Sequence, residues 1–199
     1  MNQFELLGKI SESFREVAPK PLTFGENNPF NWLLTMPSAT IGAYGAKFVS
    51  ELFRANDFNV LRPLGGSDHD RVINGHRIEV KFCTRRKEDA SFWFEQIRDQ
   101  EYDYVLCLGL SADAASCWVI PKSELTLPKE GLSPQHGGKE GKDTLQLQFQ
   151  PDAVPAWLNE FGGSLERGMQ VLNAAGIGAY KGKKLRKDDL ISLPTRMAS

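Results

Sequence analysis

Hydrophobic and polar positions repeat with two different periods along this chain, and the change between them separates predicted helices from predicted strands. Residues 3–17 place apolar side chains at helical spacing with charged side chains between them, so an amphipathic helix is expected there. A second apolar stripe predicts a helix over residues 39–56, with Ser38 as its N-cap. Further helices are expected at 154–160 and 164–175.

Strand patterns concentrate in the middle of the chain. The apolar run at 104–110 is continuous, which is typical of a strand buried on both faces. Residues 144–150 alternate and predict a half-buried strand, whereas a helix is expected at 91–99. Other strands are expected at 58–62 and 116–121. This order predicts an α/β fold in which helices flank a mixed central β-sheet of about five strands.

The Asn74-Gly75 pair lies between two alternating runs and predicts a tight β-hairpin. A two-residue turn there would pair residues 70–73 with 76–79 and give the hairpin two distinct faces. One face would carry Asp68, Asp70, Val72, Arg77, Glu79 and Lys81, and the other Arg71, Ile73, His76, Ile78, Val80 and Phe82. Because the second face is mostly apolar, we expect it to pack on a core, which leaves the carboxylates and the lysine together.

Carboxylates gathered on one hairpin face repel each other unless something compensates their charge. Mg²⁺ would do so, because it is held by one or two carboxylates together with water and phosphate oxygens. Asp70 and Glu79 are the candidate ligands, and the Val80 carbonyl could add another oxygen. Lys81 would reach a scissile phosphate from the same face, so the pattern predicts metal-assisted phosphodiester hydrolysis. An exposed hairpin face with ordinary ion pairs in water is the alternative interpretation.

Asp70, the Asn-Gly hairpin and the sequence Glu79-Val80-Lys81 resemble the motif of the PD-(D/E)xK nuclease superfamily. The resemblance covers roughly residues 40–120 and implies a restriction-endonuclease-like core. It also implies that Asp70 and Glu79 are metal ligands and that Lys81 is the catalytic lysine.

Two further roles follow from the same resemblance. Some members of the superfamily carry another Glu on the preceding helix, which would make Glu51 a metal ligand here. Some carry a Gln on the following element, which would give Gln96 a catalytic role. His69 stands where the family has proline, and this departure leaves Asp68 as a rival to Asp70 for the role of first ligand.

The resemblance implies a single nuclease domain over residues 1–199. Its core would span about 38–150, with an N-terminal helical extension at 1–37 and a C-terminal helical and basic appendage at 151–199. We expect an endonuclease that uses Mg²⁺, or Mn²⁺ in its place, to cut double-stranded DNA at a specific sequence, as type II restriction enzymes do. A homodimer is expected because two strands must be cut. The alternatives are a structure-specific repair or junction-resolving nuclease and a non-catalytic DNA-binding module.

Overall charge gives no reason to expect a polyanionic partner, because the formal net charge is −1. Any DNA contact therefore depends on local basic clusters, which can bind phosphates. The candidates are Arg85, Arg86 and Lys87 directly after the hairpin, and Lys183 and Lys184 near the C-terminus.

Composition narrows the class of protein further. Hydrophobic residues make up 41% of the 199 residues and charged residues 25%, so a disordered or coiled-coil chain is not expected. The three cysteines form no CxxC pair, which argues against a zinc knuckle or a disulfide framework and favours the cytoplasm. The N-terminus lacks the pattern of a signal peptide, and no apolar run is long enough to span a membrane. No P-loop or nucleophile elbow is found.

Overall fold

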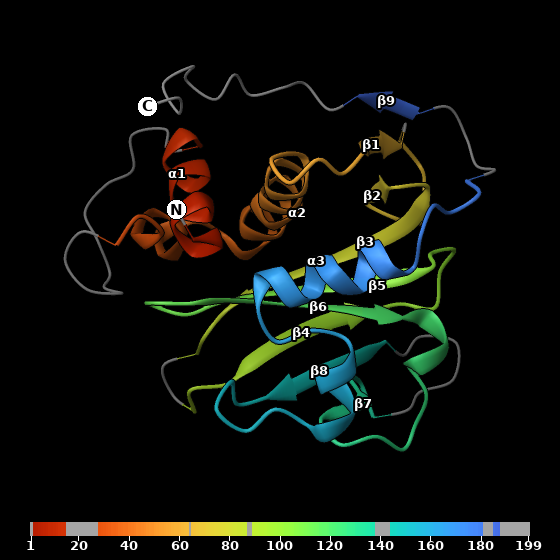
Figure 1. Ribbon diagram of the computed structural model, residues 1–199. Coiled ribbons are helices and arrows are strands. Elements are labelled where there is room, and N and C mark those ends of the chain that lie inside the picture. The colour runs from red at the N-terminus through yellow and green to blue at the C-terminus, as the bar shows by residue number, and fades with distance from the viewer. Residues whose placement is uncertain are drawn as a thin grey trace.

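The computed structural model describes residues 2–14, 28–63, 65–86, 89–137, 144–180 and 185–187, which form two β-sheets and three α-helices (Figure 1). The helices are α1 (Gln3–Ser13), α2 (Ser38–Arg54) and α3 (Leu165–Ala174). Short 3₁₀ helices are η1 (Asn31–Thr35), η2 (Lys122–Glu124) and η3 (Ala156–Glu160). The strands are β1 (Val60–Pro63), β2 (Arg71–Ile73), β3 (His76–Thr84), β4 (Phe92–Ile97), β5 (Tyr104–Leu110), β6 (Ala115–Pro121), β7 (Leu132–Pro134), β8 (Leu145–Phe149) and β9 (Leu185–Lys187).

The larger sheet is mixed and has the order β6-β5-β3-β2-β1-β9. Strand β3 pairs antiparallel with β2 and parallel with β5, while β6 runs antiparallel to β5. The three-residue β9 adds an edge strand to the five that lie between β6 and β1. The predicted α/β architecture with helices flanking a mixed sheet is therefore confirmed.

The β2–β3 hairpin has the predicted register. Arg71 pairs with Ile78, Val72 with Arg77 and Ile73 with His76. Asn74 and Gly75 both have positive φ (48° and 82°), as a type I′ turn requires. The apolar face of the hairpin packs on the core as expected, because Ile73, Ile78 and Val80 are all buried there.

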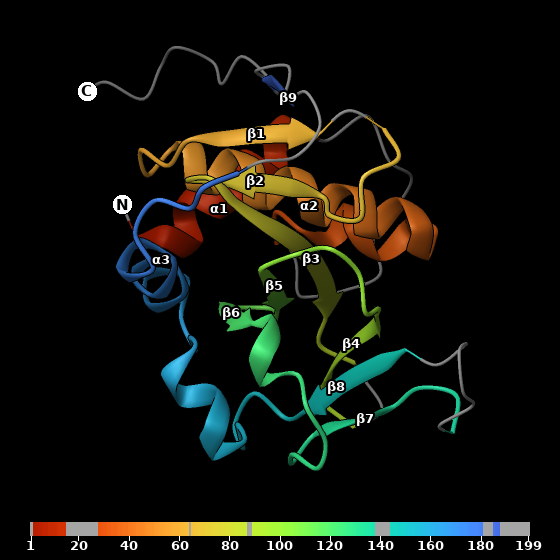
Figure 2. The same cartoon turned by 90° about the vertical axis from the view of Figure 1, so that its right-hand side faces the viewer.

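Two hydrophobic clusters lie on opposite faces of the larger sheet. The helices cover one face, where side chains of α1, α2 and α3 pack against alternate residues of β5 such as Leu106 and Leu108. The smaller sheet, of order β4-β8-β7, covers the other face and packs on Val105 and Cys107. Figure 2 shows the two sheets in this relation, with β4 and β8 below the end of β3. Because successive residues of a strand face opposite ways, β5 contributes to both clusters.

The segment at 91–99 is a strand, so the predicted helix there is wrong. Phe92 and Phe94 are fully buried and lie on one face of β4, with the half-buried Trp93 on the other face. This period of two suits a strand, and β8 supplies its partner through pairs such as Phe94–Leu147. The pairing joins residues 48 to 57 positions apart, which local periodicity does not reveal.

Most of the remaining elements follow the predictions, with two additions. Helix α1 ends at Ser13 with Phe14 as its C-cap, so the helix predicted over 3–17 is too long. The helix predicted at 154–160 is the 3₁₀ helix η3. Strand β5 has the predicted bounds, and α2, β1, β6, β8 and α3 begin and end within two residues of theirs. Strand β7 was not predicted. Strand β9 lies in the basic tail and was not predicted either. No helix in the described part of the chain combines the length and apolar character needed to cross a membrane.

Candidate active site

The site forms where β2 and β3 part. Strand β2 has three residues and β3 has nine, so the C-terminal half of β3 extends beyond its partner. Asp70, just before β2, continues the ladder by one step: its N–H donates to the Ile78 carbonyl (3.0 Å) and its Oδ2 accepts from the Val80 N–H (2.9 Å). Ile78 and Val80 flank Glu79, so these two bonds hold Asp70 beside Glu79. The predicted pairing of the two acids is thus supported by hydrogen bonds on both sides of Glu79.

A cleft of about 990 Å³ opens at this point. Its walls are the N-terminal half of α2, the C-terminal half of β3 and the cleft-facing residues of β4. Small residues line the helical wall, and a Cβ built on Gly42 would meet nothing within 4 Å. The charged and amide side chains that line the cleft are Asp70, Glu79, Lys81, Arg86, Glu95 and Gln96. The hairpin acids, the lysine and Gln96 predicted from the sequence therefore share one cleft.

Glu79 and Lys81 form a close ion pair inside this cleft. Lys81 Nζ lies 2.7 Å from Glu79 Oε1, and the two side chains are only 15% and 13% exposed. Burial raises the pKa of Glu79, the neighbouring Asp70 carboxylate raises it further, and Lys81 opposes both effects. The fold therefore holds the Asp70 and Glu79 carboxylates close together although they repel each other. The Lys81 ammonium offsets part of this repulsion. An additional cation would be stabilised by the same pair.

Gln96 reaches the cleft through an irregularity in β4. The pairing of β4 with β8 shifts register between Phe94 and Ile97, and Gln96 has a φ of 56°. Such a bulge lets consecutive residues leave the regular ladder, and both Glu95 and Gln96 line the cleft as a result. The Gln96 N–H donates to Gln135 Oε1 (2.8 Å), which fixes the bulged backbone. Gln96 is thus on a strand, not on the helix expected there.

Arg86 is the only basic residue of its predicted cluster that lines the cleft among the described residues. Its guanidinium lies over the Trp93 ring, 4.2 Å from the centroid, and the side chain is exposed. Arg85 points elsewhere, because it pairs with Asp152 (2.9 Å) and donates to the Ala90 carbonyl. Lys87, Lys183 and Lys184 lie outside the described residues, so their predicted contacts with DNA stay predictions.

Glu51 and Asp68 do not belong to the described lining of the cleft. Glu51 is 5% exposed on α2, and its Oε1 lies 2.7 Å from Arg54 Nη1. This contact favours a structural ion pair over the predicted ligand role. Asp68 lies outside the ladder and lines a neighbouring pocket. Of the two rivals for first ligand, Asp70 is therefore the one that lies beside Glu79.

Trp93 and Glu95 are cleft residues that the sequence analysis did not single out as site residues. Their signal was present: once β4 is taken as a strand, Trp93 and Glu95 alternate with the buried Phe92 and Phe94 and must face away from that core. The helix assignment concealed this alternation.

The donors in the cleft suit Mg²⁺ or Mn²⁺ better than zinc. Among the described residues, no group of three or more His, Cys, Asp and Glu side chains is placed to hold a metal ion. Mg²⁺ needs fewer, since it commonly takes one or two carboxylates and completes its octahedron with water and phosphate oxygens. The Val80 carbonyl is a further candidate, because the Val80 N–H points toward Asp70 and an extended residue directs its C=O to the same side.

Comparisons with protein-family models, curated proteins and solved structures return no match.

Proposed function

We propose that this protein is a Mg²⁺-dependent endonuclease that hydrolyses phosphodiester bonds in double-stranded DNA, as a type II restriction enzyme does. The main support for this proposal is that Asp70, Glu79 and Lys81 lie together in one cleft, at the open end of the β2–β3 hairpin. An exposed hairpin face in water would leave these side chains open to solvent. Glu79 and Lys81 are instead about 85% buried, which supports a built site.

The charge of the cleft favours a metal-dependent reaction. Its described lining carries three acidic residues (Asp70, Glu79 and Glu95) and two basic ones (Lys81 and Arg86), for a formal net charge of −1. A phosphodiester is itself an anion, so the protein alone would repel it weakly. One divalent cation reverses the sign of the cleft and makes phosphate binding favourable.

Different residues of the cleft would have different roles in the reaction. Asp70, Glu79 and the Val80 carbonyl would hold Mg²⁺, or Mn²⁺ in its place. When bound, the ion supplies positive charge to the phosphate oxygens and to the attacking water. Lys81, oriented by Glu79, stabilises the negative charge that grows on the phosphate as water adds and one P–O ester bond breaks.

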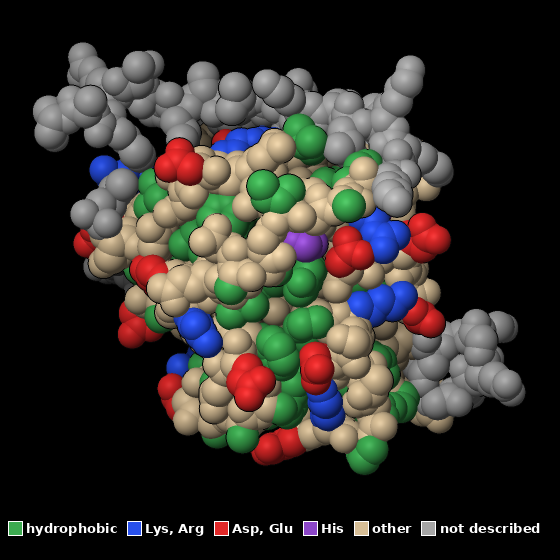
Figure 3. All heavy atoms as spheres, turned by 45° about the vertical axis from the view of Figure 1, so that its right-hand side comes forward, with side chains coloured by type: hydrophobic (Ala, Val, Ile, Leu, Met, Phe, Trp, Pro, Cys, Tyr) green, Lys and Arg blue, Asp and Glu red, His purple; other side chains and the backbone are tan. Residues whose placement is uncertain are grey.

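Arg86 and Gln96 would position the DNA substrate. The Trp93 ring orients the Arg86 guanidinium at the mouth of the cleft, where it can bind a phosphate oxygen with paired N–H donors. Gln96 offers a side-chain amide to the same substrate from the bulge in β4. On the face shown in Figure 3, acidic and basic side chains are interspersed, so binding would depend on such local contacts more than on a broad basic surface.

Digestion of a plasmid of known sequence tests the function. The purified full chain is incubated with supercoiled plasmid and Mg²⁺, with a parallel sample in EDTA, and the ends of the products are mapped. Discrete fragments with identical ends support sequence-specific cutting by a restriction-type enzyme. Cutting confined to branched or mismatched DNA would instead identify a structure-specific nuclease. If every DNA and RNA substrate stays intact with Mg²⁺ and Mn²⁺, the nuclease proposal is wrong.

The proposed homodimer can be tested separately. One active site cuts one strand at a time, so a monomer would have to cut the two strands in separate binding events. Sedimentation of the chain with and without duplex DNA gives the oligomeric state. A dimer on DNA supports concerted double-strand cutting, whereas a monomer that accumulates nicked plasmid contradicts it.

A further inference from the structure

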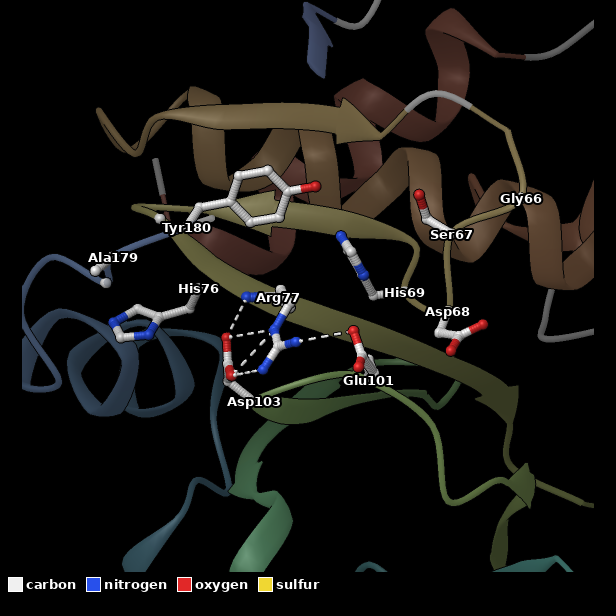
Figure 4. Close-up of a pocket in the computed structure, with 12 residues that line it drawn as sticks. Gly66, Ser67, Asp68, His69, His76, Arg77, Glu101, Asp103, Ala179 and Tyr180 are labelled. Carbon is white, nitrogen blue, oxygen red and sulfur yellow. Dashed lines mark hydrogen bonds and ion pairs between the residues drawn. The ribbon is translucent and has the colours of Figure 1, made fainter. Parts of the chain in front are cut away.

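A second pocket lies beside the cleft at the other end of the hairpin. It has a volume of about 710 Å³ and is bounded by β3, the segment before β2, the segment before β5 and the segment after α3. Figure 4 shows its interior, with the side chains of His69, His76, Arg77 and Tyr180 on different sides of the space. A pocket of this size accommodates a small organic group such as a nucleoside.

The wall after α3 is fixed to the hairpin turn. The Gly178 N–H donates to the Asn74 carbonyl (2.8 Å), and His76 Nε2 lies 3.2 Å from the Gly176 carbonyl. A Cβ built on Gly75 would lie 2.1 Å from the Gly178 carbonyl oxygen, so the two segments are in close contact. Tyr180 follows directly and packs its ring against His69, with centroids 5.8 Å apart. The pocket is therefore a formed feature of the fold.

Arg77 presents its planar guanidinium in this pocket, where two acidic residues bind it. Asp103 accepts from its Nη2 (2.7 Å), its Nε (3.2 Å) and its backbone N–H (2.7 Å), and Glu101 lies 3.5 Å from its Nη1. These bonds engage the edge of the guanidinium and compensate its charge. The faces of the guanidinium are not used by in-plane hydrogen bonds, and such a face is a stacking surface for a planar ring.

The charge of the pocket excludes a phosphate as its main ligand. Three carboxylates (Asp68, Glu101 and Asp103) line it against the single guanidinium of Arg77, a formal excess of two negative charges with neutral histidines. Aromatic rings supply much of the remaining lining, from His69, His76 and Tyr180. This combination suits an uncharged planar ring that also carries polar edges.

His69 contributes an aromatic ring to the wall of the pocket. Tyr180 packs edge to face against this ring, with the two ring planes at 72°.

We propose that this pocket binds a nucleobase of the DNA substrate, stacked on the Arg77 guanidinium among the rings of His69, His76 and Tyr180. The inference rests on the proposed nuclease function, which brings DNA to the adjacent cleft. Arg77 and Glu79 lie two residues apart on one face of β3, about 7 Å along the strand. A single nucleotide spans that distance, so a base next to the cut can enter the pocket while its phosphate lies in the cleft. Such a base must leave the helical stack, as bases do in other enzymes that bind them singly.

Free nucleosides test the pocket without relying on cleavage. The full-length protein is titrated with 2′-deoxyadenosine and 2′-deoxycytidine in EDTA, and binding is followed by NMR shifts of the histidine and tyrosine side chains. We expect saturable shifts at His69, His76 and Tyr180, and none with 2′-deoxyribose 5-phosphate, which lacks the base. Tyr180→Ala should weaken nucleoside binding at least about fivefold, because a stacking ring is lost. Tyr180→Phe keeps the ring and should bind within about twofold of the wild type.

These experiments distinguish failure of the base-binding proposal from failure of the nuclease proposal. If nucleosides do not bind, or bind equally well to Tyr180→Ala with the fold intact by circular dichroism, the pocket proposal is wrong even if DNA is cut. If N-acetyltyrosinamide binds in place of nucleosides, the pocket accepts an aromatic residue of a protein partner and the proposal is overturned. If nucleosides bind as expected but no DNA is cut with any divalent ion, the nuclease function fails and base binding stands alone. With both intact, Tyr180→Ala should raise the KM for DNA while Mg²⁺ affinity stays unchanged.

Discussion

Asp70 has two roles, one structural and one in metal binding, and a single substitution can separate them. One oxygen of its carboxylate accepts the Val80 N–H and closes the fork between β2 and β3. Its negative charge stands beside Glu79, where it adds to the raised pKa of that residue. The first task needs only an acceptor, whereas metal binding needs the charge.

Asp70→Asn should therefore keep the fold and lose the metal. The amide oxygen still accepts from Val80, but one anionic ligand is gone, so we expect Mg²⁺ or Mn²⁺ affinity to fall at least about tenfold. Calorimetric titration of each ion into the variant measures this. Asp68→Asn is the matched control and should titrate like the wild type. The reverse result, with affinity lost only in Asp68→Asn, would make Asp68 the ligand.

The Arg77–Asp103 pair should contribute stability that depends on pH. Burial alone would raise the pKa of Asp103, but hydrogen bonds from the Arg77 side chain and backbone outweigh burial and lower it. A lowered carboxyl pKa means that the stabilisation is present above the unfolded value of about 3.9 and is lost as pH falls through the folded value. Asp103→Asn should cost about 1 kcal/mol near pH 7, a modest figure because both side chains are about one-third exposed.

Urea unfolding of the wild type and Asp103→Asn across the acid range checks this assignment. The difference in unfolding free energy between the two proteins should shrink as the pH falls below about 4. A difference that stays constant with pH would mean that the ionised carboxylate is not the source of the stability.

At the scale of elements, helix α2 and strand β3 position the cleft by approaching each other closely. A Cβ built on Gly45 would lie 2.1 Å from Phe82 Cβ, so only glycine allows the observed spacing. Gly42 is one turn earlier in the same helix, and a Cβ there meets nothing within 4 Å. Substitution of either glycine by alanine therefore adds the same methyl group, at Gly45 in a crowded position and at Gly42 in an open one.

Gly45→Ala should destabilise the protein by about 1–3 kcal/mol, because the helix must move away from Phe82. Gly42→Ala should stabilise it by about 0.5–1 kcal/mol, because alanine favours a helix over glycine and no atom obstructs it. Thermal unfolding of both variants measures the two effects. Equal shifts of the same sign would contradict the close packing of α2 on β3.

The hairpin was the part of the site that the sequence could predict, since its register depends on local signals. The Asn74-Gly75 turn and the alternation around it were enough to bring Asp70 beside Glu79 and to set Lys81 on the same face. Gln96 was predicted as a site residue because it follows the hairpin, but the helix predicted around it is a strand. The wall formed by β4 depends on pairing with β8, and such distant pairing leaves little trace in local periodicity.

At the scale of the whole molecule, β5 and β6 join the two hydrophobic clusters. Cys107 belongs to the cluster under the smaller sheet and Cys117 to the cluster under the helices, although both strands serve both clusters. Each thiol is at most 1% exposed. Burial raises the pKa of Cys107 well above its usual range and that of Cys117 to about 12, so neither is reactive in the folded protein.

The two cysteines should therefore become reactive together. In increasing urea, alkylation by iodoacetamide followed by peptide mapping should give the same midpoint for Cys107 and Cys117, because neither cluster persists without the shared strands. Separate midpoints would show that the helical layer and the smaller sheet unfold independently.

Asp70, Glu79 and Lys81 together form the proposed metal-dependent phosphodiesterase site. The most direct measurement compares plasmid cleavage by the wild type and by Lys81→Ala in Mg²⁺, with DNA binding followed in parallel and Lys9→Ala as an exposed-lysine control. We expect Lys81→Ala to lose at least about a hundredfold in cleavage rate while its affinity for DNA is kept. Lys9→Ala should behave as the wild type. Cleavage by Lys81→Ala at the wild-type rate would mean that this lysine has no part in catalysis.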